Sequence, residues 1–173
     1  MKLNLGCGHD RKEGYINCDI SLKVHPDKVV NLEKKLPFKK NSVDEIIAEH
    51  VFEHIVNFIP LMHEIYRVSK PGAIIKIKVP FYASWGQWND PTHVRAFTPF
   101  TFNYFKQGNY SHEVGCDQEM FEVKKVKLNY GVGPSRFLNF LNPIINLNHR
   151  FYCRFFAWIF PAAEINLELK VKK

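Results

Sequence analysis

The sequence has no long hydrophobic run. No stretch approaches the ~20 consecutive apolar residues that a membrane-spanning helix needs. Residues 1–6 show neither a secretory nor an organelle-targeting pattern. We therefore expect a cytoplasmic protein.

Paired cysteines are also missing. The four cysteines, Cys7, Cys18, Cys116 and Cys153, include no CxxC spacing, which disfavours a zinc cluster. Disulfides are rare in the cytoplasm, so we expect these side chains to act as small apolar residues.

A third absence concerns the glycine fingerprint of dinucleotide-binding enzymes. Gly6 and Gly8 could begin a GxGxxG motif, but its third glycine is replaced by Arg11. An NAD-dependent dehydrogenase is therefore disfavoured.

The overall composition fits one globular domain, residues 1–173. Hydrophobic residues make up 46% of the chain and charged residues 24%, which is ordinary for a folded protein. The net charge of +7 favours an anionic partner. Because Lys and Arg are spread along the whole chain, a solvated basic surface is the simpler explanation, and no motif indicates nucleic acid or an oligomeric state.

Strand and helix patterns alternate along the chain, which predicts an α/β fold. Helical spacing covers residues 51–68 with a break around Pro60, and a short helix is expected over 98–105 with Thr98 as its cap. The expected strands are residues 2–5, 15–20, 28–32, 43–48, 73–79, 121–128 and 165–171. A right-handed crossover makes strand 73–79 parallel to strand 43–48.

Chemistry is indicated where the first two strands end. Gly6 and Gly8 follow the first strand, and glycine lets a backbone approach a ligand closely. Asp19 ends the second strand, where a carboxylate can accept hydrogen bonds from both ribose hydroxyls of a nucleotide-like cofactor. A tight turn without a ligand explains the glycines equally well.

Six short segments in order extend this pattern: LNLGCG (3–8), GYINCDI (14–20), LPF (36–38), SVDEI (42–46), FEHI (52–55) and EIYRVSKPG (64–72). Together they resemble the class I S-adenosylmethionine-dependent methyltransferases, and most closely the methyltransferase type 11 group. The resemblance covers residues 1–80. It implies a Rossmann-like sheet of about seven strands, with an antiparallel last strand and helices on both faces.

The resemblance also implies a set of cofactor residues. Gly6 and Gly8 would pass beneath the methionine part of S-adenosylmethionine, and Asp19 would hold its ribose. The remaining expected cofactor-site residues are Asn4, Cys7, Ile20, Asn31, Leu32 and Glu49, of which Asn31 and Leu32 would border the adenine. Glu49 and His50 would face the methionine end or the acceptor.

The chain departs from the family pattern near the glycines. Asn4 stands where an acid is frequent, and Asp10 stands where a third glycine is common. Only 11 positions separate Gly8 from Asp19, too few for a full first helix. The sequence therefore predicts a turn there and a more open cofactor pocket.

Residues 50–54 read HVFEH, which also matches the inverted zinc-peptidase motif HxxEH. Its position after a parallel strand fits a methyltransferase better. Some quinone-pathway methyltransferases resemble the chain here, with a divalent metal held at these spacings, so His50, Glu53 and His54 could hold one. Helix-start packing explains them as well, and we assign no metal.

Residues 81–173 are expected to form the acceptor-side half, and residues 1–80 the cofactor-binding half. Asp90 and His93 follow the fifth strand and could orient and deprotonate an acceptor hydroxyl. With His50 they are the expected catalytic residues, although a structural loop is an equally good explanation.

Aromatic residues and arginines are concentrated in residues 136–160. Such a mixture suits a peripheral membrane contact, a lid over an apolar acceptor or a dimer contact, whereas core packing needs fewer assumptions. The sequence thus predicts methyl transfer to a small acceptor that is anionic or lipid-linked. The alternative is a cofactor-binding or methyltransferase-like partner protein without turnover.

Overall fold

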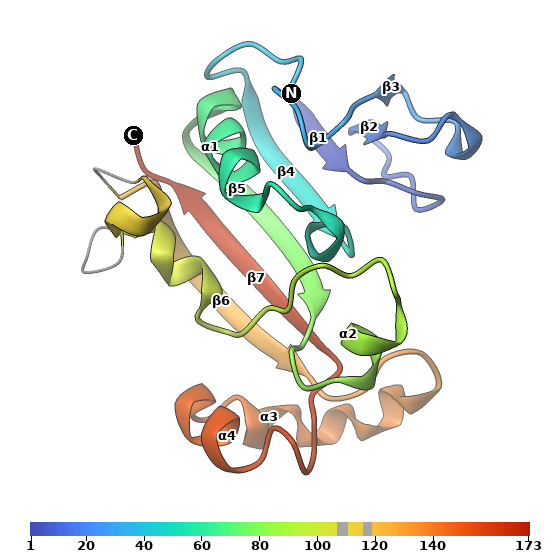
Figure 1. The fold of residues 1–173 in the computed structure, drawn as a ribbon, viewed down its shortest axis with the longest axis vertical. Coiled ribbons are helices and arrows are strands. Elements are labelled where there is room, and N and C mark those ends of the chain that lie inside the picture. The colour runs from blue at the N-terminus through green and yellow to red at the C-terminus, as the bar shows by residue number, and fades with distance from the viewer. Residues whose placement is uncertain (107–110, 116–118) are drawn as a thin grey trace.

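The computed structural model describes residues 1–106, 111–115 and 119–173 of the chain. Seven strands form one mixed sheet in the order β3-β2-β1-β4-β5-β7-β6 (Figure 1). The strands are β1 (Lys2–Leu5), β2 (Ile16–Asp19), β3 (Lys28–Val29), β4 (Val43–Glu49), β5 (Ser69–Pro80), β6 (Phe121–Asn129) and β7 (Glu164–Val171).

Strand directions follow the predicted Rossmann-like pattern. β3, β2, β1, β4 and β5 pair in parallel. β7 enters between β5 and β6 and is antiparallel to both. The expected sheet with an antiparallel last strand is therefore confirmed.

The crossover from β4 to β5 contains α1 (Phe58–Val68), which follows the short 3-10 helix η2 (Phe52–His54). The buried residues of α1 fall at helical spacing, which gives the helix one apolar face: Phe58, Leu61, Met62, Ile65 and Val68. The predicted interruption lies at residues 55–57 rather than at Pro60. Pro60 sits in the first turn of α1, where a missing N–H costs no helical hydrogen bond.

An ion pair on α1 fixes the preceding loop. Arg67 pairs with Glu64 at 2.7 Å and donates to the carbonyl oxygens of Leu36 and Phe38. Glu64 in turn accepts the N–H of Leu36 at 2.7 Å. The LPF segment is therefore held to the helix by its own backbone groups.

Phe58 lies at the centre of an aromatic cluster beside α1. Its ring meets those of Phe97, Phe102 and Phe105 edge-on, with centroids 5.3 to 5.9 Å apart, and the Arg95 guanidinium lies 5.2 Å from its centroid. Phe102 and Phe105 belong to the 3-10 helix η3 (Thr101–Phe105). That element replaces the helix expected from Thr98, because the Thr98 hydroxyl accepts the N–H of Phe100 in a local turn.

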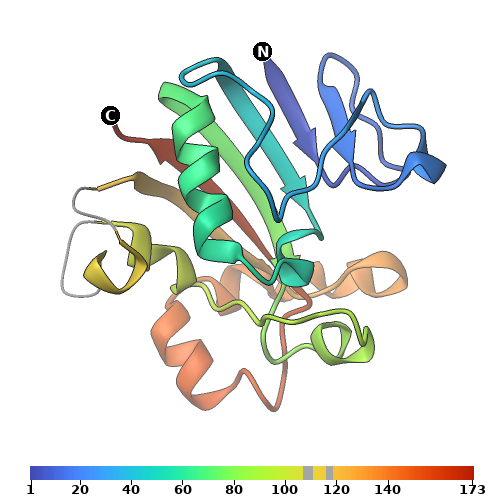
Figure 2. The same ribbon diagram turned by 45° about the horizontal axis from the view of Figure 1, so that its top comes forward.

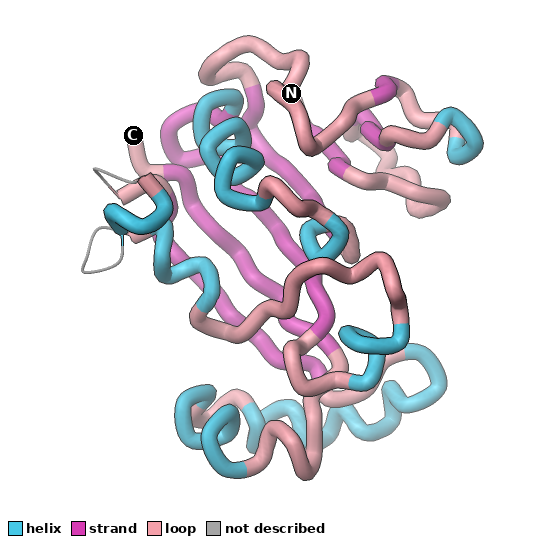
Figure 3. The backbone as a smooth tube through the Cα atoms, viewed as in Figure 1, coloured by secondary structure: helices cyan, strands magenta, loops and turns pink. Residues whose placement is uncertain are grey.

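The two faces of the sheet differ in polarity. Ile75, Ile77 and Leu169 point to one face and belong to the same buried cluster as the apolar side of α1. The other face carries cross-strand ion pairs, such as Lys76 with Glu45 at 2.5 Å. Helical segments lie in front of the sheet and beyond its lower end (Figure 3), so the centre of the second face is polar and open.

Beyond the carboxyl ends of β4, β5 and β6 lie four further short elements (Figures 1 and 2). They are α2 (Trp85–Asn89), η5 (Gly133–Leu141), α3 (Asn142–Ile145) and α4 (His149–Phe155). The sequence did not predict α2, which begins where the Ser84 side chain accepts the N–H of Gln87. None of the helices in the described ranges combines the length and apolarity that crossing a bilayer requires.

Other boundaries differ by a few residues. β3 is shorter than expected, and β5 begins at Ser69 rather than at the expected residue 73. The described thiols are free: Cys7 and Cys18 are buried, and Cys153 is half-buried. Burial raises the pKa of Cys18 to about 12, which agrees with an apolar role; Cys116 lies outside the described residues.

Replacing Phe58 by alanine should lower the free energy of unfolding by about 3 to 5 kcal/mol, because it leaves a cavity among packed rings. Chemical denaturation measures the change. Phe137→Ala is the matched control: Phe137 is 73% exposed, so its loss should alter the free energy of unfolding by about 0.5 kcal/mol or less. Equal effects of the two substitutions would contradict this packing.

Candidate functional site

A cavity of about 450 Å³ opens at the carboxyl ends of β1, β2 and β4. The strand order reverses between β1 and β4, and open α/β sheets bind ligands at such a switch point. The volume lies within the range of small-molecule sites. The residues around it are Gly6, Gly8, Asp19, Ile20, Val30, Asn31, Leu32, Glu33, His50, Val51, His54 and Ile55.

The glycine loop after β1 needs its glycines. Gly6 has a φ of +63°, and a Cβ there would come within 2.7 Å of the Val51 Cβ. Gly8 has a φ of +48°, but a Cβ there would meet nothing within 4 Å. Gly6 therefore allows close packing between the ends of β1 and β4, whereas Gly8 keeps open space beside the cavity.

Asp19 holds this loop from the end of β2. One carboxylate oxygen accepts the N–H of Gly8 at 2.9 Å, and the other accepts the N–H of Ser21 at 2.8 Å. A carboxylate offers about four acceptor positions, so the two oxygens can still accept from a ligand in the cavity.

Side-chain hydrogen bonds replace a first helix between β1 and β2. Asn4 is buried and donates to the Asn17 side chain at 3.0 Å and to the carbonyl oxygen of Asp10. Asp27 accepts both the backbone and the side-chain N–H of Asn17 and pairs with Arg11; these bonds lower the pKa of Asp27 to about 2. The turn predicted from the short spacing is confirmed.

His50 directly follows β4 in a left-handed conformation, with a φ of +52°. Its ring nitrogens lie 3.5 Å from the Glu164 carboxylate and 3.4 Å from that of Glu53. The two carboxylates, Glu164 first, raise the pKa of His50 to about 9. The ring, half-exposed at the cavity, is therefore a cation at neutral pH.

A second histidine, His54, is held by a chain of hydrogen bonds. The Thr92 hydroxyl donates to Asp90 at 2.6 Å, so its oxygen accepts from His54 Nδ1 at 2.9 Å. This leaves His54 Nε2 unprotonated in the neutral ring. The bonds from Thr92 lower the pKa of Asp90, which is therefore a carboxylate at neutral pH.

His93 supports His54 from the side. Its Nδ1 donates to the Gln87 carbonyl oxygen at 2.8 Å, and its ring packs edge-on against that of His54 with centroids 4.7 Å apart. Neither His93 nor Asp90 lines the cavity. His93 contacts His54, which does line it, and Asp90 is connected to His54 through Thr92.

Glu53, His54 and His93 could hold a divalent cation. Their potential ligand atoms lie within 4.8 Å of one another, and the Glu53 side chain is fully buried. Ligands of a tetrahedral zinc ion are only about 3.4 Å apart, so the group would have to contract. Among the residues that the structure describes, none makes a hydrogen bond of ordinary geometry to the Glu53 carboxylate, but the His50 cation, 3.4 Å away, balances its charge.

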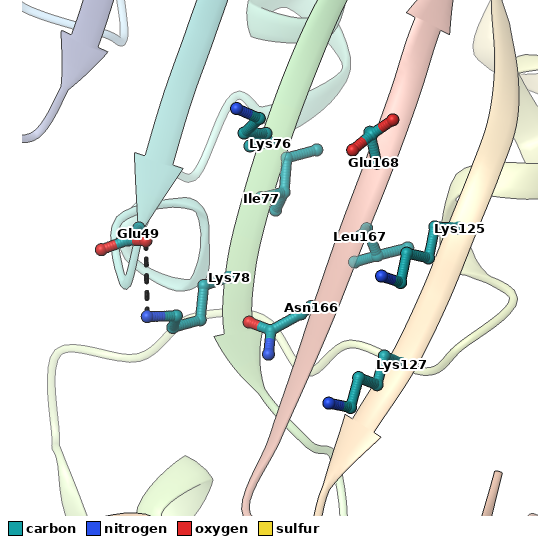
Figure 4. A pocket seen from close by; sticks show the side chains of 9 residues that line it. All are labelled: Glu49, Lys76, Ile77, Lys78, Lys125, Lys127, Asn166, Leu167 and Glu168. Atoms are coloured by element: carbon teal, nitrogen blue, oxygen red, sulfur yellow. Dashed lines mark ion pairs between the residues drawn. The ribbon is translucent and has the colours of Figure 1, made fainter.

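Three expected cofactor residues lie elsewhere. Asn4, in β1, and Cys7, within the glycine loop, are buried and do not line the cavity. Glu49 lies on the open face of the sheet, because successive strand residues point to opposite faces. There it pairs with Lys12 and Lys78, each at 3.3 Å, beside a shallow hollow between β4, β5, β7 and β6 (Figure 4).

The sequence missed two partners in this site. Glu164 lies far along the chain from His50, and only the pairing of β7 with β5 brings them together. The role of Thr92 was also missed, although Asp-x-Thr is a sequence that favours such a local hydrogen-bonded turn.

Residues 3–77 match the sequence profile of a family described as a methyltransferase domain. No curated protein matches the chain in sequence. Among solved structures, an S-adenosylmethionine-dependent methyltransferase from Archaeoglobus fulgidus is similar, with a TM-score of 0.65 at 18% identity over 98% of this chain and 85% of its own.

Two further structures share the fold. An S-adenosylmethionine-dependent methyltransferase from Mesorhizobium loti gives a TM-score of 0.60 at 13% identity, over 98% of this chain and 89% of its own. The cyclase SpnF gives 0.63 at 16% identity, over 99% of this chain and 75% of its own. The sequence match and the shared fold agree with the resemblance: residues 3–77 match a methyltransferase-domain profile, and the chain has the Rossmann-like fold of these solved methyltransferases.

Proposed function

We propose that the chain transfers the methyl group of S-adenosylmethionine to a small acceptor that is anionic or lipid-linked. The observation that carries the proposal is the cavity at the switch point between β1 and β4, with the glycine loop on one side and His50 and His54 on the other. In this proposal residues 1–80 bind the cofactor, and residues 81–173 complete the acceptor side of a single domain.

The lining residues fit such a cofactor. Open space beside Gly8 and the accepting oxygens of Asp19 suit the methionine backbone and the ribose. Asn31 and Leu32, with Ile20, provide a polar and an apolar border for the adenine. When bound, S-adenosylmethionine supplies a methyl group on a positively charged sulfur, which makes that carbon electrophilic.

His54 is placed to receive the acceptor's proton. It lines the cavity, and the bond from Nδ1 to Thr92 leaves Nε2 as the free acceptor atom. Asp90, through Thr92, and His93, through ring packing, are positioning residues for His54. Alignment of the acceptor in the cavity supplies most of the remaining acceleration.

His50 serves a different purpose. With a raised pKa it is protonated at neutral pH and is a poor proton acceptor there. Its half-exposed cation instead favours an acceptor that carries negative charge close to the reacting atom. Glu53 and Glu164 hold the ring in position.

A protein that binds the cofactor without turnover is the second candidate. SpnF shares this fold and is described as a cyclase, so the fold hosts other chemistry than methyl transfer. A metabolite-extract screen with a radiolabelled methyl donor separates the two candidates. Labelled product supports the enzyme, whereas cofactor binding without product supports the second candidate.

Asp19→Ala should weaken binding of S-adenosylmethionine by about 1 to 3 kcal/mol in calorimetry, because charged hydrogen bonds to the ribose are lost. Gly8→Ala should weaken it by filling the open space beside the cavity. Gly14→Ala is the matched control: Gly14 has a φ of +77° and open space around it but lies outside the cavity. Unchanged affinity in the first two variants would show that S-adenosylmethionine does not bind in this cavity.

His54→Gln should lower the rate of methyl transfer by about 100-fold or more and leave the cofactor Kd unchanged, because a general base contributes rates of that order. Asp90→Asn and Thr92→Val should have smaller effects that disappear in the His54→Gln background. They should also shift the pH profile of kcat/KM, which a merely structural role would not do. If the effects of the substitutions on the rate were fully additive, the hydrogen-bonded series Asp90–Thr92–His54 would be contradicted.

The ring of His50 should titrate near pH 9 in an NMR experiment on the folded chain, against an ordinary value of 6.5. Because the folded pKa is raised, its stabilising effect is fully present below pH 6.5 and is lost as the pH rises through 9. The difference in unfolding free energy between wild type and His50→Gln should therefore shrink over that interval. A midpoint near 6.5 would show that the two carboxylates do not hold the proton.

A further inference from the structure

Exposed apolar side chains cover the elements beyond the carboxyl ends of the parallel strands. Between residues 132 and 160, eleven large apolar side chains are exposed, to between 41% and 83% of their surface. They are Val132, Phe137, Phe140, Ile144, Leu147, Phe151, Phe155, Phe156, Trp158, Ile159 and Phe160. We call this set the aromatic face; exposed apolar surface on this scale marks an interaction site.

The backbone beneath the aromatic face is well anchored. Buried Tyr152 accepts the N–H of Ala162 at 2.7 Å and donates to the Phe160 carbonyl oxygen at 2.8 Å. Asn146 binds both backbone groups of Leu128 at 2.8 Å, which fixes α3 to β6. The exposed rings are therefore held outward by the fold itself.

Charge around the aromatic face has one sign. From residue 123 to residue 163 the chain contains six Lys and Arg residues and no Asp or Glu. Three of the six, Arg136, Arg150 and Arg154, are exposed among the apolar side chains. This mixture of aromatic, aliphatic and arginine side chains is the composition of surfaces that lie in the interface of a bilayer.

An apolar cavity of about 450 Å³ opens within the aromatic face. Its walls include Leu141, Ile144, Phe151 and Phe156, and its lining offers almost no polar group apart from Asn148 and two tyrosines. Such a cavity suits a hydrocarbon chain. Two further tryptophans, Trp85 and Trp88 of α2, are exposed by 76% and 65%. The Trp88 indole donates to the backbone carbonyl oxygen of Tyr82, and the Tyr82 ring packs edge-on against Trp158, so α2 adjoins the aromatic face.

A second copy of the chain fits this surface poorly. A two-fold interface brings each patch against itself, so the three arginines would face their own copies, and residues 123–163 contain no carboxylate to pair with them. A negatively charged bilayer complements both the arginines and the apolar side chains. We infer that the aromatic face is a docking surface for an anionic lipid bilayer, onto which the chain binds without crossing it.

The acceptor site lies next to this surface. β7 begins at Glu164, four residues after Phe160, and the Glu164 carboxylate contacts His50 at 3.5 Å. Docking would therefore bring the cavity beside His50 close to the lipid headgroups. The inference stands on the surface alone and does not require the proposed methyl transfer.

Sedimentation with vesicles tests the inference directly. Wild-type protein should pellet with vesicles of phosphatidylcholine and phosphatidylglycerol, and much less with phosphatidylcholine alone. Phe137→Ser, Leu147→Ser and Phe155→Ser combined should lower the partition coefficient by about 100-fold or more. Replacing Arg136, Arg150 and Arg154 by Gln should lower it by about fivefold per arginine and remove most of its salt dependence.

Matched controls keep the result interpretable. Leu22→Ser and Val56→Ser replace side chains exposed by 72% and 64% away from the aromatic face, and should leave vesicle binding unchanged. Asp19→Ala should also bind vesicles as wild type does, which separates docking from the proposed function. Thermal unfolding of each variant checks that the fold is intact.

A direct contact is measured by fluorescence. Lipids with brominated acyl chains should quench the tryptophan emission of the wild-type chain, and Trp158→Phe should lose part of that quenching. Failure of the folded wild type to bind anionic vesicles would overturn the inference. So would a dimer that forms without lipid and is dissolved by the three serine substitutions.

Discussion

The fully buried carboxylate of Glu53 constrains the whole site. A charge removed from water must be balanced nearby, and His50 provides the balancing cation at the end of β4. His50 also meets Glu164, so one ring joins η2, β4 and β7. The Glu53 carbonyl oxygen in addition accepts the N–H of Val94 at 2.9 Å, which brings the loop carrying Asp90 and Thr92 against His54.

Side-chain hydrogen bonds also hold the glycine-loop side of the cavity. Between β1 and β2 the chain forms no full helix, and the side chains of Asn4, Asn17 and Asp27 satisfy backbone groups directly. Asp19 does the same for the glycine loop. Asn4 and Asn17 are buried, and buried polar groups are costly unless they are hydrogen-bonded, so this loop is defined by its hydrogen bonds rather than by helical packing.

The sequence predicted the sheet well because its signals are local. Strand periodicity, the glycines and the segments from LNLGCG to EIYRVSKPG indicated the strands, the antiparallel last strand by resemblance, and the position of Asp19. It did not predict that Glu49 and His50 serve opposite faces, nor that Glu164 would pair with His50. Those contacts depend on register and on a strand inserted from the far end of the chain, and neither leaves a local signal.

One face of the sheet is polar at its centre, and this affects which residues of the chain can be substituted. Lys76, Lys78, Lys125 and Lys127 stand on β5 and β6 around a shallow hollow rather than beneath a helix (Figure 4). Substitutions at such positions disturb no packed layer and cost little stability. The hollow is therefore a surface where a tag or a label can be attached, or a binding site for a new partner can evolve, without displacing the cavity or the aromatic side chains.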